Sequence, residues 1–142
     1  MQHAMLQRFG EAPNTVYFPL TAVASVVVTM ESGHGLEALM IGYEGAIGLP
    51  VFDGLAATSE TIVQCAGDSL VISRRDFQTH LQLLPEFSYA VSTFAGLSLA
   101  STSQTAACNR FHNLEARAAR WLLMMQDRGG QDTMHVTQEQ LA

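Results

Sequence analysis

Histidine, cysteine and serine, the side chains that most often carry catalysis or bind metals, are scattered along this chain of 142 residues. The histidines, at positions 3, 34, 80, 112 and 135, form neither an H-x-x-x-H nor an H-E-x-x-H pattern, so their spacing predicts no metal site. Cys65 and Cys108 lie too far apart for a zinc motif, and no serine lies in a G-x-S-x-G sequence. The sequence therefore predicts neither an enzyme nor a bound cofactor.

The stretch "EGAIGLPVFDG" (44–54) has the composition most typical of a ligand site, because glycine-rich loops present backbone N–H groups to anions. A bound phosphate would also need a basic partner, and the segment that follows offers Ser59 and Glu60, whose carboxylate would repel an anion. Tight turns at the end of a β-roll explain the glycines equally well, so both interpretations stay open. The residues of this degenerate effector-pocket region are Gly45, Gly48, Leu49, Pro50, Ser59 and Glu60.

Charge is distributed unevenly along the chain, and all seven of its basic residues are arginines. Acidic residues outnumber arginines in 1–109, whereas the two are balanced in 110–142. An acidic body does not bind nucleic acid by itself, because phosphate contacts come from basic side chains. An anionic partner is therefore expected at the C-terminal part, with Arg117 and Arg120 as phosphate contacts; a solvated helix face is the alternative interpretation.

Short segments rich in β-branched and aromatic residues fill the first half of the chain and predict strands. They cover 15–20, 22–30 and 36–42, and a final pair lies within 60–73, divided at Gly67. Frequent turn residues between short strands predict a β-sandwich, roll or barrel.

The second half predicts helices. Ser73 followed by Asp76 is typical of a helix cap and opens a short helix, and Pro85 opens a long one that reaches about residue 109. Between these ends of the long helix only Glu86 is charged, so we expect a second subunit to cover the face that its own roll leaves open. The expected dimer interface consists of Phe87, Val91, Phe94, Leu97, Ser101 and Cys108. A third helix is expected over 113–127, capped by Asn113, and "HVTQEQLA" (135–142) begins a fourth.

The stretches "VYFPLTAVASVVVTM", "IGYEGAIGLPVFDG", "QTAACNRFHNLEARAARWLLMMQDR" and "HVTQEQLA" resemble the Crp/Fnr family of bacterial transcription regulators. The resemblance implies a mainly β plus α fold in three parts. A jelly-roll (double-stranded β-helix) cyclic-nucleotide-binding-like domain is expected at 1–84, with an incomplete N-terminus. A dimerisation helix at 85–110 and the incomplete beginning of a winged helix-turn-helix domain at 111–142 follow. The implied DNA-phosphate contacts are Arg117, Arg120, Thr137 and Gln138.

The chain departs from this family in the effector pocket. Cyclic-nucleotide binders of the family carry a Gly-Glu pair and an Arg-Ser/Thr pair, whereas here Gly48 is followed by Leu49 and Pro50, and Ser59 and Glu60 occupy the place of the second pair. We therefore expect no tight binding of cyclic AMP or cyclic GMP, and the sequence identifies no other small effector.

The function predicted from the sequence is the sensor and dimerisation portion of a cytoplasmic, homodimeric regulator that binds DNA through its C-terminal domain. The alternative is a ligand-sensing module of the same fold that regulates a partner outside transcription. No apolar run approaches the length of a membrane span, so a membrane location is not expected.

Overall fold

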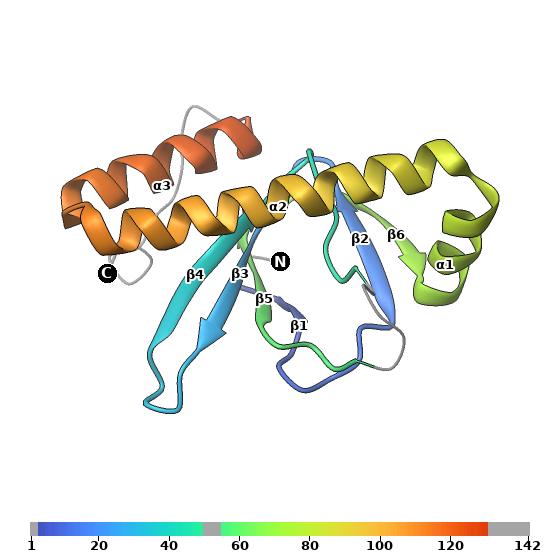
Figure 1. Cartoon of the computed structure of the whole chain (residues 1–142), viewed down its shortest axis with the longest axis horizontal. Coiled ribbons are helices and arrows are strands. Elements are labelled where there is room, and N and C mark those ends of the chain that lie inside the picture. The colour runs from blue at the N-terminus through green and yellow to red at the C-terminus, as the bar shows by residue number, and fades with distance from the viewer. Residues whose placement is uncertain (1–2, 50–54, 131–142) are drawn as a thin grey trace.

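The computed structural model describes residues 3–49 and 55–130, in which six strands are followed by three helices (Figure 1). The strands are β1 (Met5–Gln7), β2 (Thr15–Pro19), β3 (Val23–Thr29), β4 (Gly35–Ile41), β5 (Glu60–Cys65) and β6 (Ser69–Ser73). The helices are α1 (Arg74–Leu83), α2 (Pro85–Phe111) and α3 (Leu114–Gly129). The expected order of strands before helices is confirmed, and the bounds of β2 to β6 agree with the sequence-based ranges to within one or two residues. Strand β1, which has three residues, was not predicted from the sequence.

The strands form two antiparallel sheets that together make the roll. One sheet has the order β1-β5-β3-β4, and the other pairs β2 with β6. Because side chains alternate between the faces of a strand, neighbouring residues of β3 serve different cores. Val23 packs with Met40 and Met125, whereas Ala24 packs with Ile41 and Ile47. Both faces of the sheet are therefore covered at this point.

The helix ends follow from local chemistry. The Ser73 hydroxyl accepts the Asp76 N–H at 3.1 Å and caps α1, and the Asn113 side chain accepts the Ala116 N–H at 2.9 Å and caps α3. Pro85 occupies the first turn of α2, where its missing N–H costs nothing. Gly130 ends α3 in the left-handed conformation. The signals at Ser73, Pro85 and Asn113 were predicted from the sequence.

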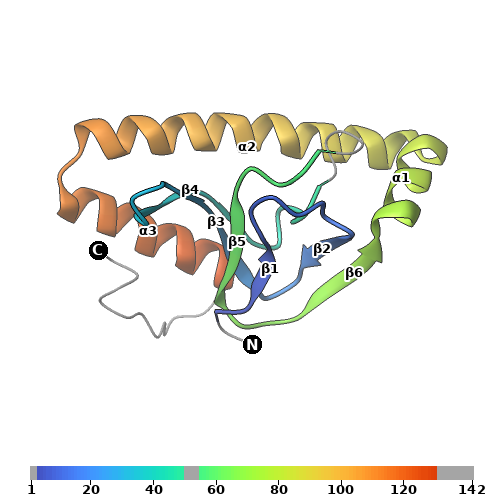
Figure 2. The same cartoon turned by 90° about the horizontal axis from the view of Figure 1, so that it is seen from below.

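The helices lie against the roll in different ways. Phe77 of α1 is buried among aromatic side chains, with its ring 5.4 Å from that of Phe87 and 6.3 Å from that of Phe18. The 27-residue α2 crosses the whole roll, and α3 turns back along its C-terminal half (Figures 1 and 2). Helix α3 contacts β3 and β4, so the chain after α2 returns to the sheet.

Candidate functional site

The glycine-rich loop before residue 50 lies between β2 and α2. Ile47 exchanges two backbone hydrogen bonds with Tyr17 of β2, and both Ala46 and Ile47 are buried. Gly48 has φ +79°, and a Cβ at this position would lie 2.5 Å from the Thr15 carbonyl oxygen, so the position requires glycine. Tight packing against a strand thus accounts for Gly48, and Pro50 lies outside the described residues.

The Phe94 ring of α2 fills the space beside Gly45. A Cβ on Gly45 would collide with the Phe94 ring, and Phe94 packs against two core clusters of the roll. Leu49 also packs on the first of these clusters. The loop is therefore closed on its α2 side by an aromatic side chain of the same chain.

The second half of the expected effector pocket lies at the start of β5. Ser59 and Glu60 are half-buried, and Glu60 accepts a hydrogen bond from the Thr29 hydroxyl at 3.0 Å. Among the described residues, no arginine forms an ion pair with Glu60. Glu60 is thus a carboxylate with no arginine paired to it within the described residues, at a position where the family resemblance implies a phosphate-binding pair.

Helix α2 has an inner and an outer series of residues, both spaced alternately three and four apart. The inner series is turned toward the roll and α3, and it is half-buried or buried: Phe87, Val91, Phe94, Ser98, Ser101, Thr105 and Cys108. Five of the six residues expected at the dimer interface belong to this series. Phe87, Val91 and Phe94 pack on the roll's own core, which assigns them to contacts within one chain.

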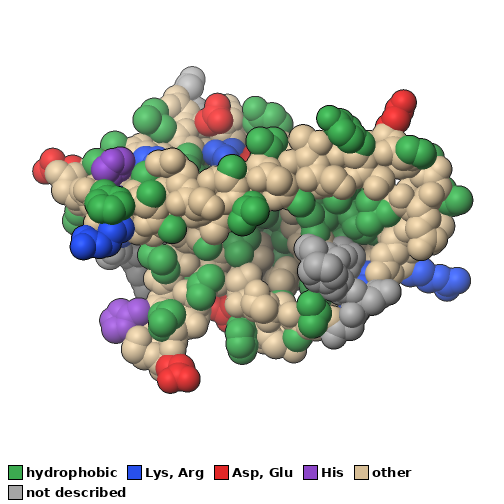
Figure 3. Space-filling model, viewed as in Figure 1, with side chains coloured by type: hydrophobic (Ala, Val, Ile, Leu, Met, Phe, Trp, Pro, Cys, Tyr) green, Lys and Arg blue, Asp and Glu red, His purple; other side chains and the backbone are tan. Residues whose placement is uncertain are grey.

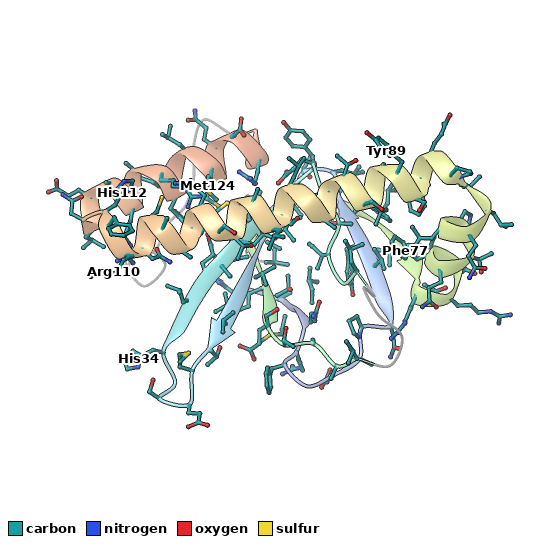
Figure 4. All side chains as sticks on the ribbon, viewed as in Figure 1. His34, Phe77, Tyr89, Arg110, His112 and Met124 are labelled. Carbon is teal, nitrogen blue, oxygen red and sulfur yellow. The ribbon has the colours of Figure 1, made fainter. Side chains whose placement is uncertain are left out.

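The outer series of α2 is exposed along its whole length and uncharged: Ala90, Thr93, Leu97, Ala100, Gln104, Ala107 and Phe111. Leu97 is the expected interface residue that belongs to it. Figure 3 shows mostly uncharged atoms along α2, and Figure 4 shows the exposed Tyr89 side chain pointing away from the roll. Charge occurs at the two ends of the helix, with Glu86 in the first turn and Arg110 in the last.

The arginines of α3 face the body of the protein. Arg128 Nε donates to Glu44 Oε1 at 2.7 Å, and both terminal nitrogens of Arg120 lie 3.2 Å from the Thr105 hydroxyl of α2. Arg117 and Arg120 line a common cavity with Glu37. In this arrangement α3 does not present the two expected phosphate contacts on an open face, and Thr137 and Gln138 lie outside the described residues.

Two further contacts, made by Trp121 and Met125, hold α3 on the roll. Trp121 Nε1 donates to Glu37 Oε2 at 3.0 Å, and the same oxygen accepts a short hydrogen bond from Ser25. Met125 completes a buried cluster with Val23 and Met40. The sequence did not predict Glu37 or Glu44 as partners, because both pairs join residues 84 positions apart and carry no local signal.

The described residues contain neither a cluster of metal ligands nor a helix that could span a membrane. No group of three or more His, Cys, Asp or Glu side chains is placed to hold a metal ion. In the same part of the chain, every helix is too short or too polar to cross a membrane.

Comparisons with known proteins place the fold. No protein-family model and no curated protein matches the chain. Solved structures do match it, including the c-di-GMP-responsive global regulator CLP of Xanthomonas campestris, which is 18% identical with a TM-score of 0.69 over 93% of this chain and 67% of that one. A CRP-family transcriptional regulator from Thermus thermophilus is 17% identical with a TM-score of 0.74, over 90% of this chain and 63% of that one. A Crp/Fnr-family protein from Eubacterium rectale is 8% identical with a TM-score of 0.78, over 99% of this chain and 66% of that one.

The chain therefore has the fold of a Crp/Fnr-like, cyclic-nucleotide-binding-like domain followed by a long helix. The chain spans 63% of the Thermus protein and 66% and 67% of the other two. These similar structures are transcription regulators and a cyclic-nucleotide-binding domain. Proteins of these two kinds are, in general, not enzymes.

Proposed function

We propose that this chain is the sensor and dimerisation portion of a cytoplasmic, DNA-binding transcription regulator of Crp/Fnr type. One observation carries the proposal: α2 is 27 residues long, has no charged residue between Glu86 and Arg110, and leaves its outer series exposed. A helix face that meets only water is normally rich in charge. A second copy of α2 against the outer series explains why this face is not.

The outer series has the spacing of a two-stranded coiled coil, in which residues three and four apart form one seam. Leu97 and Phe111 supply its large apolar side chains, and alanines at 90, 100 and 107 let two helices approach closely. The proposed register differs from the interface expected from the sequence, which included Phe94; the half-buried Phe94 ring packs against the core of its own roll.

The test of this seam compares two leucines on the same helix. Leu97 is 65% exposed within the outer series, and Leu99 is 71% exposed two positions further on, which turns it by roughly 200° around the helix. Leu97→Glu would place two unpaired carboxylates in the seam, which costs several kcal/mol, whereas Leu99→Glu would place its charge outside the proposed seam.

We expect the wild type and Leu99→Glu to be dimers, and Leu97→Glu to be a folded monomer. Light scattering after gel filtration gives the mass, and circular dichroism checks the fold. A monomeric wild type, or a Leu97→Glu dimer as tight as the wild type, would contradict the proposed function.

We further propose that the degenerate effector-pocket region does not respond to cyclic AMP or cyclic GMP. Three features support this: the Phe94 ring beside Gly45, the Glu60 carboxylate, and the lack of an arginine at Ser59. A cyclic phosphate without a cation in a partly desolvated site loses several kcal/mol. Isothermal titration calorimetry should detect no tight binding of either nucleotide, and low-micromolar affinity for one of them would refute this part.

In this proposal α3 is the first helix of the DNA-binding unit. Because Arg117 and Arg120 face a cavity of the same chain, they reach phosphate only when α3 leaves the roll. We therefore expect weak, strongly salt-dependent binding of these residues to duplex DNA, measured by fluorescence anisotropy. Tight, sequence-specific binding with α3 docked would contradict this arrangement.

A further inference from the structure

The space between the larger sheet, the last turns of α2 and α3 is a cavity of about 640 Å³. This volume is within the range of small-molecule sites, about 300–1,000 Å³. Residues of the glycine-rich loop (42–49) and of the β5 start (58–60) do not line this cavity. It is therefore separate from the degenerate effector-pocket region expected from the sequence. Its walls come from β1, β3, β4 and β5 on one side and from the two helices on the other.

The helix side of this cavity carries positive charge. Arg117 and Arg120 lie three positions apart on one face of α3, and within the described residues neither forms an ion pair. Arg120 is hydrogen-bonded to Thr105, which is a neutral acceptor. Among the residues that the structure describes, Glu37 is the single acidic one that lines the cavity, and its Oε2 already accepts hydrogen bonds from Ser25 and Trp121. Two guanidinium groups therefore face the cavity opposite one carboxylate.

The rest of the lining is mainly apolar and contains an aromatic ring. Trp121 and Met124 line it from α3, and Figure 4 shows Met124 on the side of α3 that faces α2. An indole and a thioether are favourable neighbours for a flat ring. The sheet contributes further apolar side chains, namely Met5, Val27, Leu36 and Ile62.

We infer that this cavity binds a small anion with a flat apolar or aromatic body. The anionic group lies between Arg117 and Arg120, where two planar guanidinium groups donate several hydrogen bonds to its oxygens. The body lies against Trp121 and the strand side chains.

The role of this site as the effector pocket rests on the proposed function. A ligand in the cavity contacts the sheet, α2 and α3 together, so it favours the arrangement in which α3 is docked. Because it binds the docked state better than a released one, it shifts the equilibrium between them.

Isothermal titration calorimetry with the whole 142-residue chain tests the site, with naphthalene-2-sulfonate as the probe. Naphthalene-2-sulfonamide has nearly the same shape but no charge, so it tests whether binding requires the negative charge. Inorganic phosphate has the charge but no aromatic body, so it tests whether binding requires the ring. We expect saturable binding of the sulfonate, and binding about tenfold weaker or more for the sulfonamide and for phosphate.

Three variants locate the probe. Arg117→Gln should weaken sulfonate binding by about tenfold, since it removes one charged donor. Arg110→Gln removes an arginine that lies over the Phe111 ring and does not line the cavity, so its affinity should equal that of the wild type. Ala118→Phe fills the cavity from α3 and should abolish binding.

Three outcomes would overturn the site: no saturable sulfonate binding up to about 1 mM, equal affinity for the sulfonamide, or an unchanged affinity in both Arg117→Gln and Ala118→Phe. The mass of the same samples, measured by light scattering, separates the two proposals. A dimer that fails to bind the probe refutes the site alone, whereas a monomer refutes the proposed function whatever the titration gives.

Discussion

Replacing Met125 by alanine tests whether α3 is part of the folded body. Met125 is 4% exposed and packs with Val23 and Met40, both of which are buried. Removing a buried methionine side chain costs about 2–5 kcal/mol, and a site with two rigid strand neighbours cannot collapse easily, so we expect a loss of about 3 kcal/mol in the free energy of unfolding. For a chain of this length, this loss lowers the melting temperature by roughly 6–12 °C.

Leu123→Ala is the matched control for this change. Leu123 is 66% exposed on the same helix, and leucine and methionine have similar helix propensities, so the two variants differ mainly in burial. We expect a change of about 0.5 kcal/mol or less for the control. Urea unfolding should be followed by tryptophan fluorescence and circular dichroism at one protein concentration, because dimerisation makes stability depend on concentration.

Equal stability of Met125→Ala and Leu123→Ala would refute the docking of α3. In that case the buried cluster of Val23 and Met40 would have to be closed by something other than Met125. A loss confined to Met125→Ala supports a helix that is packed on the sheet in the resting protein.

The other predictions concern single contacts. Gly48→Ala forces a side chain onto a left-handed residue 2.5 Å from the Thr15 carbonyl oxygen, and it should cost about 2–3 kcal/mol in urea unfolding. Asn113→Ala removes the cap of α3 and should cost about 1 kcal/mol, with faster amide exchange in the first turn. Trp121→Phe removes the donor to Glu37 and should cost about 1–2 kcal/mol.

Each of these has an outcome that contradicts its reasoning. A Gly48→Ala protein as stable as the wild type would mean that the loop can adopt another backbone path. Unchanged exchange in Asn113→Ala would mean that packing, and not the cap, fixes the start of α3. A neutral Trp121→Phe would mean that water replaces the indole N–H at no cost.

Local signals account for the part of the fold that the sequence predicted. Ser73, Pro85 and Asn113 each act within one helical turn, so the starts of the three helices could be predicted from neighbouring residues. Segments rich in β-branched and aromatic residues likewise predicted β2 to β6. The order and type of elements were therefore predictable.

The orientation of α2 was not predictable from spacing. Its inner and outer series have the same three-and-four repeat, and neither contains a charged residue. The sequence-based choice followed the larger side chains, Phe87 and Phe94, which pack on the chain's own roll. The contacts of Glu37 with Trp121 and of Glu44 with Arg128 were not predicted from the sequence for a different reason. They depend on α3 returning to the sheet, and no local pattern specifies that return.

The return of α3 to the sheet has a consequence for synthesis on the ribosome. The side chains of α3 that cover the Val23–Met40 cluster, Trp121, Met124 and Met125, are made about 80 residues after β4 is complete. At a synthesis rate of about 5–20 residues per second, this apolar surface of the nascent sheet stays uncovered for roughly 4–17 s. A nascent chain stalled before α3 should therefore recruit a chaperone that a chain stalled after α3 does not.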